Sequence, residues 1–203
     1  KGIGLETAKG LAAKNIDLIL VSRSTEKLNH VKRSIESKYK INCDVFSYDL
    51  SLIRSNFEFH KLIVEKYPKI DILVNNVGAI FMNRTTTDEG LEKTFALNHM
   101  SYFVLSVLFA ESFESLKIIN VSSEAHRRIT LKMNDLQSRH GYYGWHAYKR
   151  SKLANIYLTY ESNRKYIDKD ITINCLHPGL VNTDFANNNS LPFKIISSFI
   201  KYF

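Results

Sequence analysis

The sequence contains little cysteine. Its two cysteines, Cys43 and Cys175, lie far apart in apolar segments that resemble strands, with no CxxC or Cys/His spacing. This pattern excludes a cysteine-rich disulfide framework and gives no zinc-binding motif. It is typical of a reducing, intracellular compartment, so we expect a location in the cytoplasm or on the cytoplasmic face of a membrane.

Long hydrophobic runs and flexible linkers are also missing. No apolar run reaches the roughly 18 residues that a membrane-spanning helix needs. With only three prolines and eight glycines, no Gly/Ser/Pro-rich linker divides the chain, and no internal repeat is evident. A length of 203 residues with 44% hydrophobic residues is enough to bury one sizeable core. We therefore expect residues 1–203 to form a single domain.

Acidic residues are fewer than basic ones. The sequence has 20 acidic residues and 28 lysines and arginines, which gives a formal net charge of +8. Such a charge attracts polyanions, among them nucleic acids, anionic lipids and polyphosphate cofactors. The basic residues are spread over several predicted helices and form no single stripe, unlike those of a nucleic-acid-binding surface. We therefore predict no nucleic-acid partner and, in the absence of a metal-binding pattern, no metal site.

Short apolar, β-branched segments alternate with longer segments of helical periodicity. The predicted strands are residues 16–21, 43–48, 70–74, 116–121 and 171–176, and the predicted helices are residues 5–14, 25–39, 52–67, 89–113 and 145–165. Ser24, Ser51 and the cluster 85–88 are predicted to cap the helices that follow them. The alternation indicates an α/β fold with a doubly wound parallel sheet of the Rossmann type.

The glycines at the start of the chain suggest a phosphate-binding turn. Gly2, Ile3 and Gly4 stand directly before the first predicted helix, like the second half of a dinucleotide-binding glycine turn. Glycine lets the backbone approach a pyrophosphate, and the N-terminus of a helix attracts its charge. An ordinary turn explains two glycines equally well, so this signal is weak alone.

The ends of the next two predicted strands carry candidate cofactor contacts. Arg23 follows the first strand, where an acidic residue would bind the ribose hydroxyl of NAD and an arginine can bind the 2′-phosphate of NADP. NADP is therefore preferred, NAD stays open, and a solvated loop arginine is the alternative. Asp49 and Leu50 follow the second strand, where the aspartate could hold the adenine amino group or simply cap a helix.

The predicted strand 70–74 is followed by two amide side chains and a glycine, and residues of these types at the end of a buried strand require an explanation. Asparagine side chains can lock neighbouring loops to strand ends, and Gly78 leaves room for a flat ligand. The segment Asn75-Asn76-Val77-Gly78 resembles the Asn-Asn-Ala-Gly signature of the short-chain dehydrogenase/reductase family, with Val77 in place of alanine. The resemblance implies that Asn76, Val77 and Gly78 contact a nicotinamide cofactor.

Further signatures follow in the order of that family and span nearly the whole chain. They are Asn98 in the long helix, Ser123 after the next strand, the Tyr-x-x-x-Lys pair Tyr148 and Lys152, and a Pro-Gly-x-Val-x-Thr loop with Pro178, Gly179, Val181 and Thr183. The resemblance implies catalytic roles for the first four residues. It also implies that Tyr148, Lys152 and the loop residues bind the cofactor.

Elementary electrostatics supports a reactive tyrosine. Tyr148 and Lys152 lie one helical turn apart, on the same face. A free tyrosine has a pKa of roughly 10, and an ammonium about 4 Å from the phenolate contributes roughly 4 kcal/mol, enough to lower that pKa by about three before desolvation is subtracted. Tyr148 is thus expected to act as a general acid/base.

The resemblance assigns the other roles. It implies that Ser123 binds the substrate oxygen, that Asn98 holds a water connected to Lys152, and that Lys152 bridges the ribose hydroxyls of the nicotinamide nucleotide. The predicted activity is NADP(H)-dependent interconversion of an alcohol and a carbonyl. A catalytically idle, cofactor-binding scaffold of the same fold is the alternative, although it would have no need of these four residues.

Several segments indicate a branch of the family. The sequence around Asn98-His99, the long insertion between Ser123 and Tyr148, and Leu153-Ala154-Asn155 resemble the retinol dehydrogenase-like branch. That resemblance implies a small lipophilic alcohol or carbonyl substrate, such as a retinoid-like, steroid-like or aldehyde compound. His126, within the insertion, is interpreted as a loop residue.

The two ends of the chain carry their own expectations. Residues 191–203 form a basic, apolar pattern that could close over the substrate, contact a membrane peripherally, or pack on further sequence. The family resemblance implies a homodimer through the helices 89–113 and 145–165. It also implies further strands before Gly2 and after Phe203, so we expect a fragment whose sheet has a gap between the strands 16–21 and 70–74.

Overall fold

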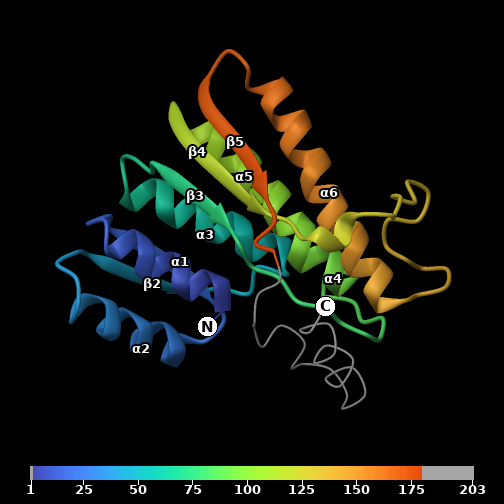
Figure 1. Ribbon diagram of the computed structural model, residues 1–203, viewed down its shortest axis with the longest axis horizontal. Coiled ribbons are helices and arrows are strands. Elements are labelled where there is room, and N and C mark those ends of the chain that lie inside the picture. The colour runs from blue at the N-terminus through green and yellow to red at the C-terminus, as the bar shows by residue number, and fades with distance from the viewer. Residues whose placement is uncertain (1, 180–203) are drawn as a thin grey trace.

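The computed structural model describes residues 2–179, and strands and helices alternate along them as predicted (Figure 1). The strands are β1 (Leu18–Ser22), β2 (Cys43–Ser47), β3 (Ile72–Asn75), β4 (Ser115–Val121) and β5 (Asp170–Leu176). The helices are α1 (Gly2–Ala12), α2 (Thr25–Glu36), α3 (Ile53–Lys66), α4 (Lys93–Phe95), the π-helical turn η1 (Ala96–Met100), α5 (Ser101–Ser112), the 3-10 turn η2 (Glu124–His126) and α6 (Gly144–Lys165).

All described strand pairs are parallel, but they form two sheets. β1 pairs with β2, and β4 lies between β3 and β5 in a three-stranded sheet. Within residues 2–179 neither β1 nor β3 has a strand on its other side. The interruption therefore lies where the sequence predicted a gap.

The helices pack on both sheets and on one another. α2 lies against β1 and β2 and α1 against β1, while α5 packs on β4, α6 packs on β5 and β4, and α3 packs on α5 (Figure 1). The larger core cluster contains Phe59, Phe109 and Ile118, and Ile19 and Val21 of the other sheet pack against it. Burial of each such side chain contributes roughly 1.5–3 kcal/mol, so this core holds the two sheets together.

Local capping signals predicted some helix starts and failed at others. The Ser24 side chain accepts a hydrogen bond from Lys27 N, as predicted for α2. Ser51 does not cap α3, because its hydroxyl donates to the Asp49 carboxylate at 2.7 Å. The long predicted helix starts at Lys93, with Glu92 as its cap, and so the capping prediction for residues 85–88 is wrong.

The first turn of α3 is bound by a carboxylate from a distant part of the chain. Glu89 accepts hydrogen bonds from Ile53 N at 2.5 Å and Arg54 N at 3.0 Å. A carboxylate with two acceptor oxygens satisfies two free N–H groups and complements the positive end of the helix dipole, which one serine hydroxyl cannot do. The tertiary contact therefore replaces the local cap.

Gly144 determines how closely α6 approaches the loop after β3. A Cβ built at Gly144 would clash with the carbonyl oxygen of Phe81 and would lie 2.6 Å from Met82 Cα. Both are backbone atoms that cannot rotate away. Only glycine lets the first turn of α6, which leads to Tyr148, pack at this distance.

Gly144→Ala is expected to lower the free energy of unfolding of the full-length protein by about 1–3 kcal/mol, because the added methyl group displaces backbone. Gly10→Ala is the matched control, since nothing lies within 4 Å of a Cβ at this exposed position in α1. The control is expected to gain about 0.5–1 kcal/mol from helix propensity. Urea denaturation measures both, and equal stability of the two variants would contradict the close approach.

Candidate active site

The carboxyl ends of β3, β4 and β5 meet at one edge of the sheet, and the loops that leave them carry several of the predicted site residues. Open α/β sheets bind ligands at this edge. The loop after β3 carries Gly78, the loop after β4 carries Ser123, and α6 passes beside both.

Tyr148 and Lys152 lie on one face of α6 and are almost fully buried, with 7% and 3% of their surface exposed. Lys152 Nζ is 6.0 Å from the centroid of the Tyr148 ring. The Tyr148 side chain is hydrogen-bonded to that of Ser123, and its ring stacks on Trp145 with the centroids 5.6 Å apart. The structure therefore brings together the predicted tyrosine, lysine and serine.

Asn98 lies in the π-helical turn η1 and uses its whole amide group to hold the loop after β3. Its Oδ1 accepts from Ala79 N at 2.9 Å, and its Nδ2 donates to Ala79 O at 2.8 Å and to Ser151 Oγ at 3.1 Å. The backbone carbonyl of Asn98 accepts from Asn155 Nδ2 at 2.8 Å. Both amide hydrogens of Asn98 are thus used, so a water bound by Asn98 would have to donate to one of its oxygens.

Lys152 carries its charge in a buried position. Its Nζ donates to the carbonyl oxygen of Val121 at 2.8 Å and lies 5.2 Å from the centroid of the Tyr102 ring. Within residues 2–179 no carboxylate forms an ion pair with it. Burial lowers the pKa of Lys152 to about 8, because the ammonium loses its hydration.

Burial acts on Tyr148 in the direction opposite to our expectation. It raises the pKa of Tyr148, and the hydrogen bond with Ser123 offsets this only in part. The prediction of a lowered pKa is not met, because burial outweighs the attraction of Lys152, whose Nζ donates to Val121 O and lies 6.0 Å from the ring centroid. A raised pKa keeps the Tyr148 hydroxyl protonated at neutral pH.

Among the glycines predicted to contact a cofactor, Gly78 belongs to the loop after β3 and Gly4 approaches that loop. A Cβ at Gly78 would be 3.5 Å from both Lys152 Nζ and Asn98 Oδ1. A Cβ at Gly4 would be 2.7 Å from Asn76 Nδ2, so the first turn of α1 approaches that loop closely. Gly2 has φ +64°, a conformation that favours glycine. Gly2, Ile3 and Gly4 belong to the first turn of α1, which begins three residues earlier than predicted.

Other predicted contacts are more distant or lie outside the described part. Arg23 is exposed after β1, where its carbonyl oxygen accepts from Ser47 Oγ, and Asp49 is engaged with Ser51. Leu50 is a core residue, so any ligand contact would come from its backbone. Pro178 and Gly179 follow β5. Val181, Thr183 and the segment 191–203 lie outside the described residues.

Sequence reasoning missed polar residues on α6 that support the site. Ser151 binds Asn98, and Asn155 binds both the Asn98 carbonyl and His99 Nδ1, the latter at 2.9 Å. These residues are three and seven positions after Tyr148 and therefore share its helix face. Polar side chains at buried helical spacing were the signal that could have identified them.

A second missed set crosses the sheet behind the site. Asn75 Nδ2 donates to Ser106 Oγ at 3.0 Å and to Asn120 Oδ1 at 2.9 Å, and Asn120 Nδ2 donates to Thr159 Oγ1 at 3.0 Å. The set joins β3, β4, α5 and α6. Because buried amides are costly to leave unpaired, it fixes the relative positions of these elements.

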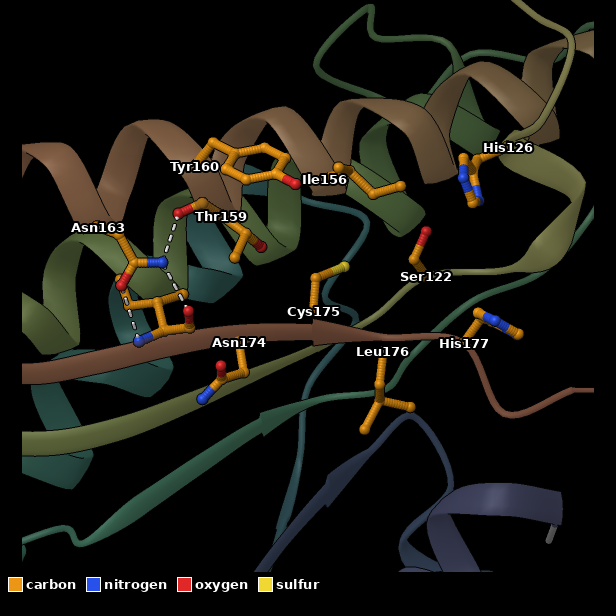
Figure 2. A pocket seen from close by; sticks show the side chains of 11 residues that line it. Ser122, His126, Ile156, Thr159, Tyr160, Asn163, Asn174, Cys175, Leu176 and His177 are labelled. Carbon is orange, nitrogen blue, oxygen red and sulfur yellow. Dashed lines mark hydrogen bonds between the residues drawn. The ribbon is translucent and has the colours of Figure 1, made fainter.

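An open pocket of about 380 Å³ lies between α6 and β5 (Figure 2). Along it, Asn163 Nδ2 donates to Ile173 O at 2.6 Å and Asn163 Oδ1 accepts from Ile173 N at 3.2 Å, which satisfies part of the β5 edge. Its described lining includes Ser122 and His126 but not Ser123, Tyr148 or Lys152. The pocket is therefore separate from the cluster of Tyr148, Lys152 and Ser123. His126, interpreted as a loop residue, lies in η2 and lines the pocket.

The described residues contain neither a metal-binding cluster nor a membrane-spanning helix. No group of three His, Cys, Asp or Glu side chains within residues 2–179 is arranged to hold a metal ion. None of the helices in that range combines the length and the apolar character that crossing a bilayer demands.

Comparison with known proteins agrees with this geometry. The short chain dehydrogenase family model matches residues 1–192. Human retinol dehydrogenase 13 is 32% identical over 202 residues, which cover 97% of this chain and 61% of the relative. The chain thus spans about three-fifths of that relative's length.

Two solved structures share the fold. A protein from Mycobacterium paratuberculosis has 28% identity and a TM-score of 0.80, with 93% of this chain and 68% of that chain covered. A metagenomic short-chain oxidoreductase, solved with NADP, has 23% identity and a TM-score of 0.74, with coverage of 89% and 78%. Together with the family match, these likenesses show that the chain belongs to the short-chain dehydrogenase family and resembles its retinol dehydrogenase-like branch.

Proposed function

We propose that this protein is an NADP(H)-dependent oxidoreductase that interconverts an alcohol and a carbonyl, with Tyr148 as the general acid/base. The observation that carries the proposal is the buried cluster of Tyr148, Lys152 and Ser123 at the carboxyl end of β4. Membership of the family supports nicotinamide chemistry. The cluster supports proton transfer at one substrate oxygen.

Two features of the described residues support the binding of a dinucleotide. Gly4 lies so close to Asn76 that a side chain would not fit there, and only backbone is present at this position in the first turn of α1. The N–H groups of a helix N-terminus favour a phosphate group. Arg23 is exposed at the end of β1 and free of any described ion pair, so it is available to a 2′-phosphate. When bound, NADPH supplies the hydride that reduces the carbonyl carbon.

The chain's own residues handle the proton. In reduction, Tyr148 donates its hydroxyl proton to the oxygen that becomes the alcohol, and the Ser123 hydroxyl contacts the same oxygen. The Tyr148 O–H bond breaks, the alcohol O–H bond forms, and the phenolate left behind is stabilised by the Lys152 ammonium until solvent returns a proton. Because burial raises the pKa of Tyr148, reduction suits neutral pH and oxidation requires higher pH.

The proposed substrate is small and lipophilic, of a retinoid-like, steroid-like or aldehyde class. The relationship to a retinol dehydrogenase supports this class. The segment between Ser123 and Tyr148 also exposes Met133 and Tyr143, with 74% and 53% of their surface accessible. Apolar side chains exposed in a loop beside a site favour an apolar ligand.

The proposal extends to location and assembly. Free thiols at Cys43 and Cys175 suit an intracellular, reducing compartment, in the cytoplasm or at the cytoplasmic face of a membrane. A homodimer through α5 and α6 is supported by Phe103 and Tyr157, which are 43% and 54% exposed on those helices.

Tyr148→Phe tests the reaction. NADPH consumption is followed with a panel of hydrophobic aldehydes and ketones at pH 7, and the loss of the proton donor is expected to lower kcat about 10²–10⁴-fold. The affinity for NADPH is expected to stay unchanged. Tyr160→Phe is the control, since Tyr160 lies on the same helix and is 73% exposed. Tight NADPH binding by the wild type without turnover on any substrate would instead support the idle scaffold.

Arg23→Ala tests the cofactor preference. Loss of a charged hydrogen bond, roughly 1.5–3 kcal/mol, is expected to weaken NADPH binding about 10- to 100-fold and to leave NADH binding unchanged. Fluorescence titration measures both dissociation constants. Arg33→Ala, an exposed arginine on α2, controls for the general loss of positive charge. Equal NADPH affinity in wild type and Arg23→Ala would make Arg23 a solvated loop residue.

The pH dependence of reduction tests the state of Lys152. The ammonium is present below its pKa of about 8 and is lost as pH rises through that value. The kcat/KM for NADPH, which reports the free enzyme, is therefore expected to fall tenfold for each pH unit above about 8. Lys149 is a neighbouring lysine on α6, and the Lys149→Met variant is expected to show the same decrease of kcat/KM at alkaline pH as the wild type. A profile that stays level to pH 9.5 contradicts the role given to Lys152.

A further inference from the structure

The Lys152 ammonium is buried without a counter-charge. Transfer of an unpaired charge into the interior is costly, and within residues 2–179 no carboxylate offsets this cost. One backbone carbonyl, that of Val121, accepts a hydrogen bond from Nζ. The remaining compensation has to come from the groups that surround the ammonium.

Tyr102 is the aromatic residue nearest to that ammonium. It lies on α5, four residues after Asn98, and none of its surface is exposed. Its ring centroid is 5.2 Å from Lys152 Nζ, within the roughly 6 Å at which a cation is attracted by an aromatic face. The Tyr148 ring is more distant, at 6.0 Å.

The hydroxyl of Tyr102 fixes where its ring lies. It donates to Val77 O at 2.9 Å and lies 3.5 Å from Val121 O, the carbonyl that also accepts from Lys152. Tyr102 thus connects the loop after β3, the end of β4 and the ammonium. A buried phenylalanine would fill the same space, but it would leave the Val77 carbonyl without this donor.

We propose that Tyr102 is a positioning residue for the reaction: its ring face holds the Lys152 ammonium beside Tyr148, and its hydroxyl ties that ring to the cofactor-side loop at Val77. The inference rests on the proposed function. It adds a residue outside the Tyr-x-x-x-Lys pair on which the charge of Lys152 depends.

Within residues 2–179, three titratable groups face Lys152 from the elements packed around it. They are Tyr102 from α5, Tyr148 from α6 and Cys175 from β5. Burial raises the pKa of all three, so each is neutral near pH 7. The attraction available to the ammonium is therefore that of dipoles and ring faces, and loss of the Tyr102 ring lowers the pKa of Lys152.

The first test measures this pKa directly in the full-length protein and needs no turnover. Lysine side chains are labelled with ¹³C, Lys152→Met assigns the signal, and NMR follows its titration. Tyr102→Phe keeps the ring and is expected to leave the pKa of Lys152 within about 0.3 of wild type. Tyr102→Leu is expected to lower it by about 0.5–1, a 3- to 10-fold loss in the protonation constant.

A variant that keeps the shape of the aromatic ring separates the electrostatic effect of the ring from an effect of misfolding. Incorporation of 3,4,5-trifluorophenylalanine at position 102 withdraws electron density from the ring face, so the pKa of Lys152 is expected to fall relative to Tyr102→Phe. Phe103→Leu, an exposed position next to it on α5, is expected to have no effect. A pKa that stays the same in the leucine and trifluorophenylalanine variants overturns the proposal. The proposal is also overturned if Tyr102→Phe lowers the pKa of Lys152 as much as Tyr102→Leu does. In that case the hydroxyl of Tyr102, and not its ring, would sustain the charge of Lys152.

The second test is kinetic. In Tyr102→Leu the alkaline limb of kcat/KM for NADPH is expected to move to lower pH by the same amount as the pKa, while Tyr102→Phe keeps the wild-type limb. A purely structural role would lower stability and leave the limb in place, which contradicts the proposal. If wild type turns over no substrate, the proposed function fails, and the NMR titration still decides whether Tyr102 sustains the charge of Lys152.

Discussion

The burial of one ammonium group is the constraint on which the arrangement of the site depends. Lys152 can stay charged only if dipoles replace the water it has lost, and α6 therefore has to press it against the end of β4, where the Val121 carbonyl points at Nζ. The same packing buries Tyr148 and raises its pKa. In the proposed reaction, this pairing would let Tyr148 give up a proton beside an ammonium that favours the resulting phenolate.

Buried amides keep this arrangement in place. Asn98 holds the backbone of Ala79, Asn155 holds the backbone of Asn98, and Asn120 joins β4 to Thr159 on α6. Each unpaired amide would cost about 1–3 kcal/mol, so the strand ends and the two helices cannot shift independently. The π-helical turn at Asn98 fits this reading, because such turns often place a functional residue where a regular helix cannot.

The sequence predicted what depends on local pattern and failed where distant groups decide. Strand and helix alternation and the four-residue spacing of Tyr148 and Lys152 follow from periodicity. Ser51 failed as a helix cap because Glu89, far along the chain, supplies a better acceptor. The lowered pKa expected for Tyr148 failed because spacing along a helix does not reveal where an ammonium points or how much water surrounds the phenol.

The two halves of the proposed site belong to different sheets, and this division affects how a dinucleotide would bind. Arg23 and the start of α1 lie with β1, whereas the reactive cluster lies with β4 and α6. Core packing of Ile19 and the approach of Gly4 to Asn76 connect the halves, but no described strand pairs across them. A ligand that contacts both halves binds only when they are correctly placed, so its binding free energy adds directly to the stability of that arrangement.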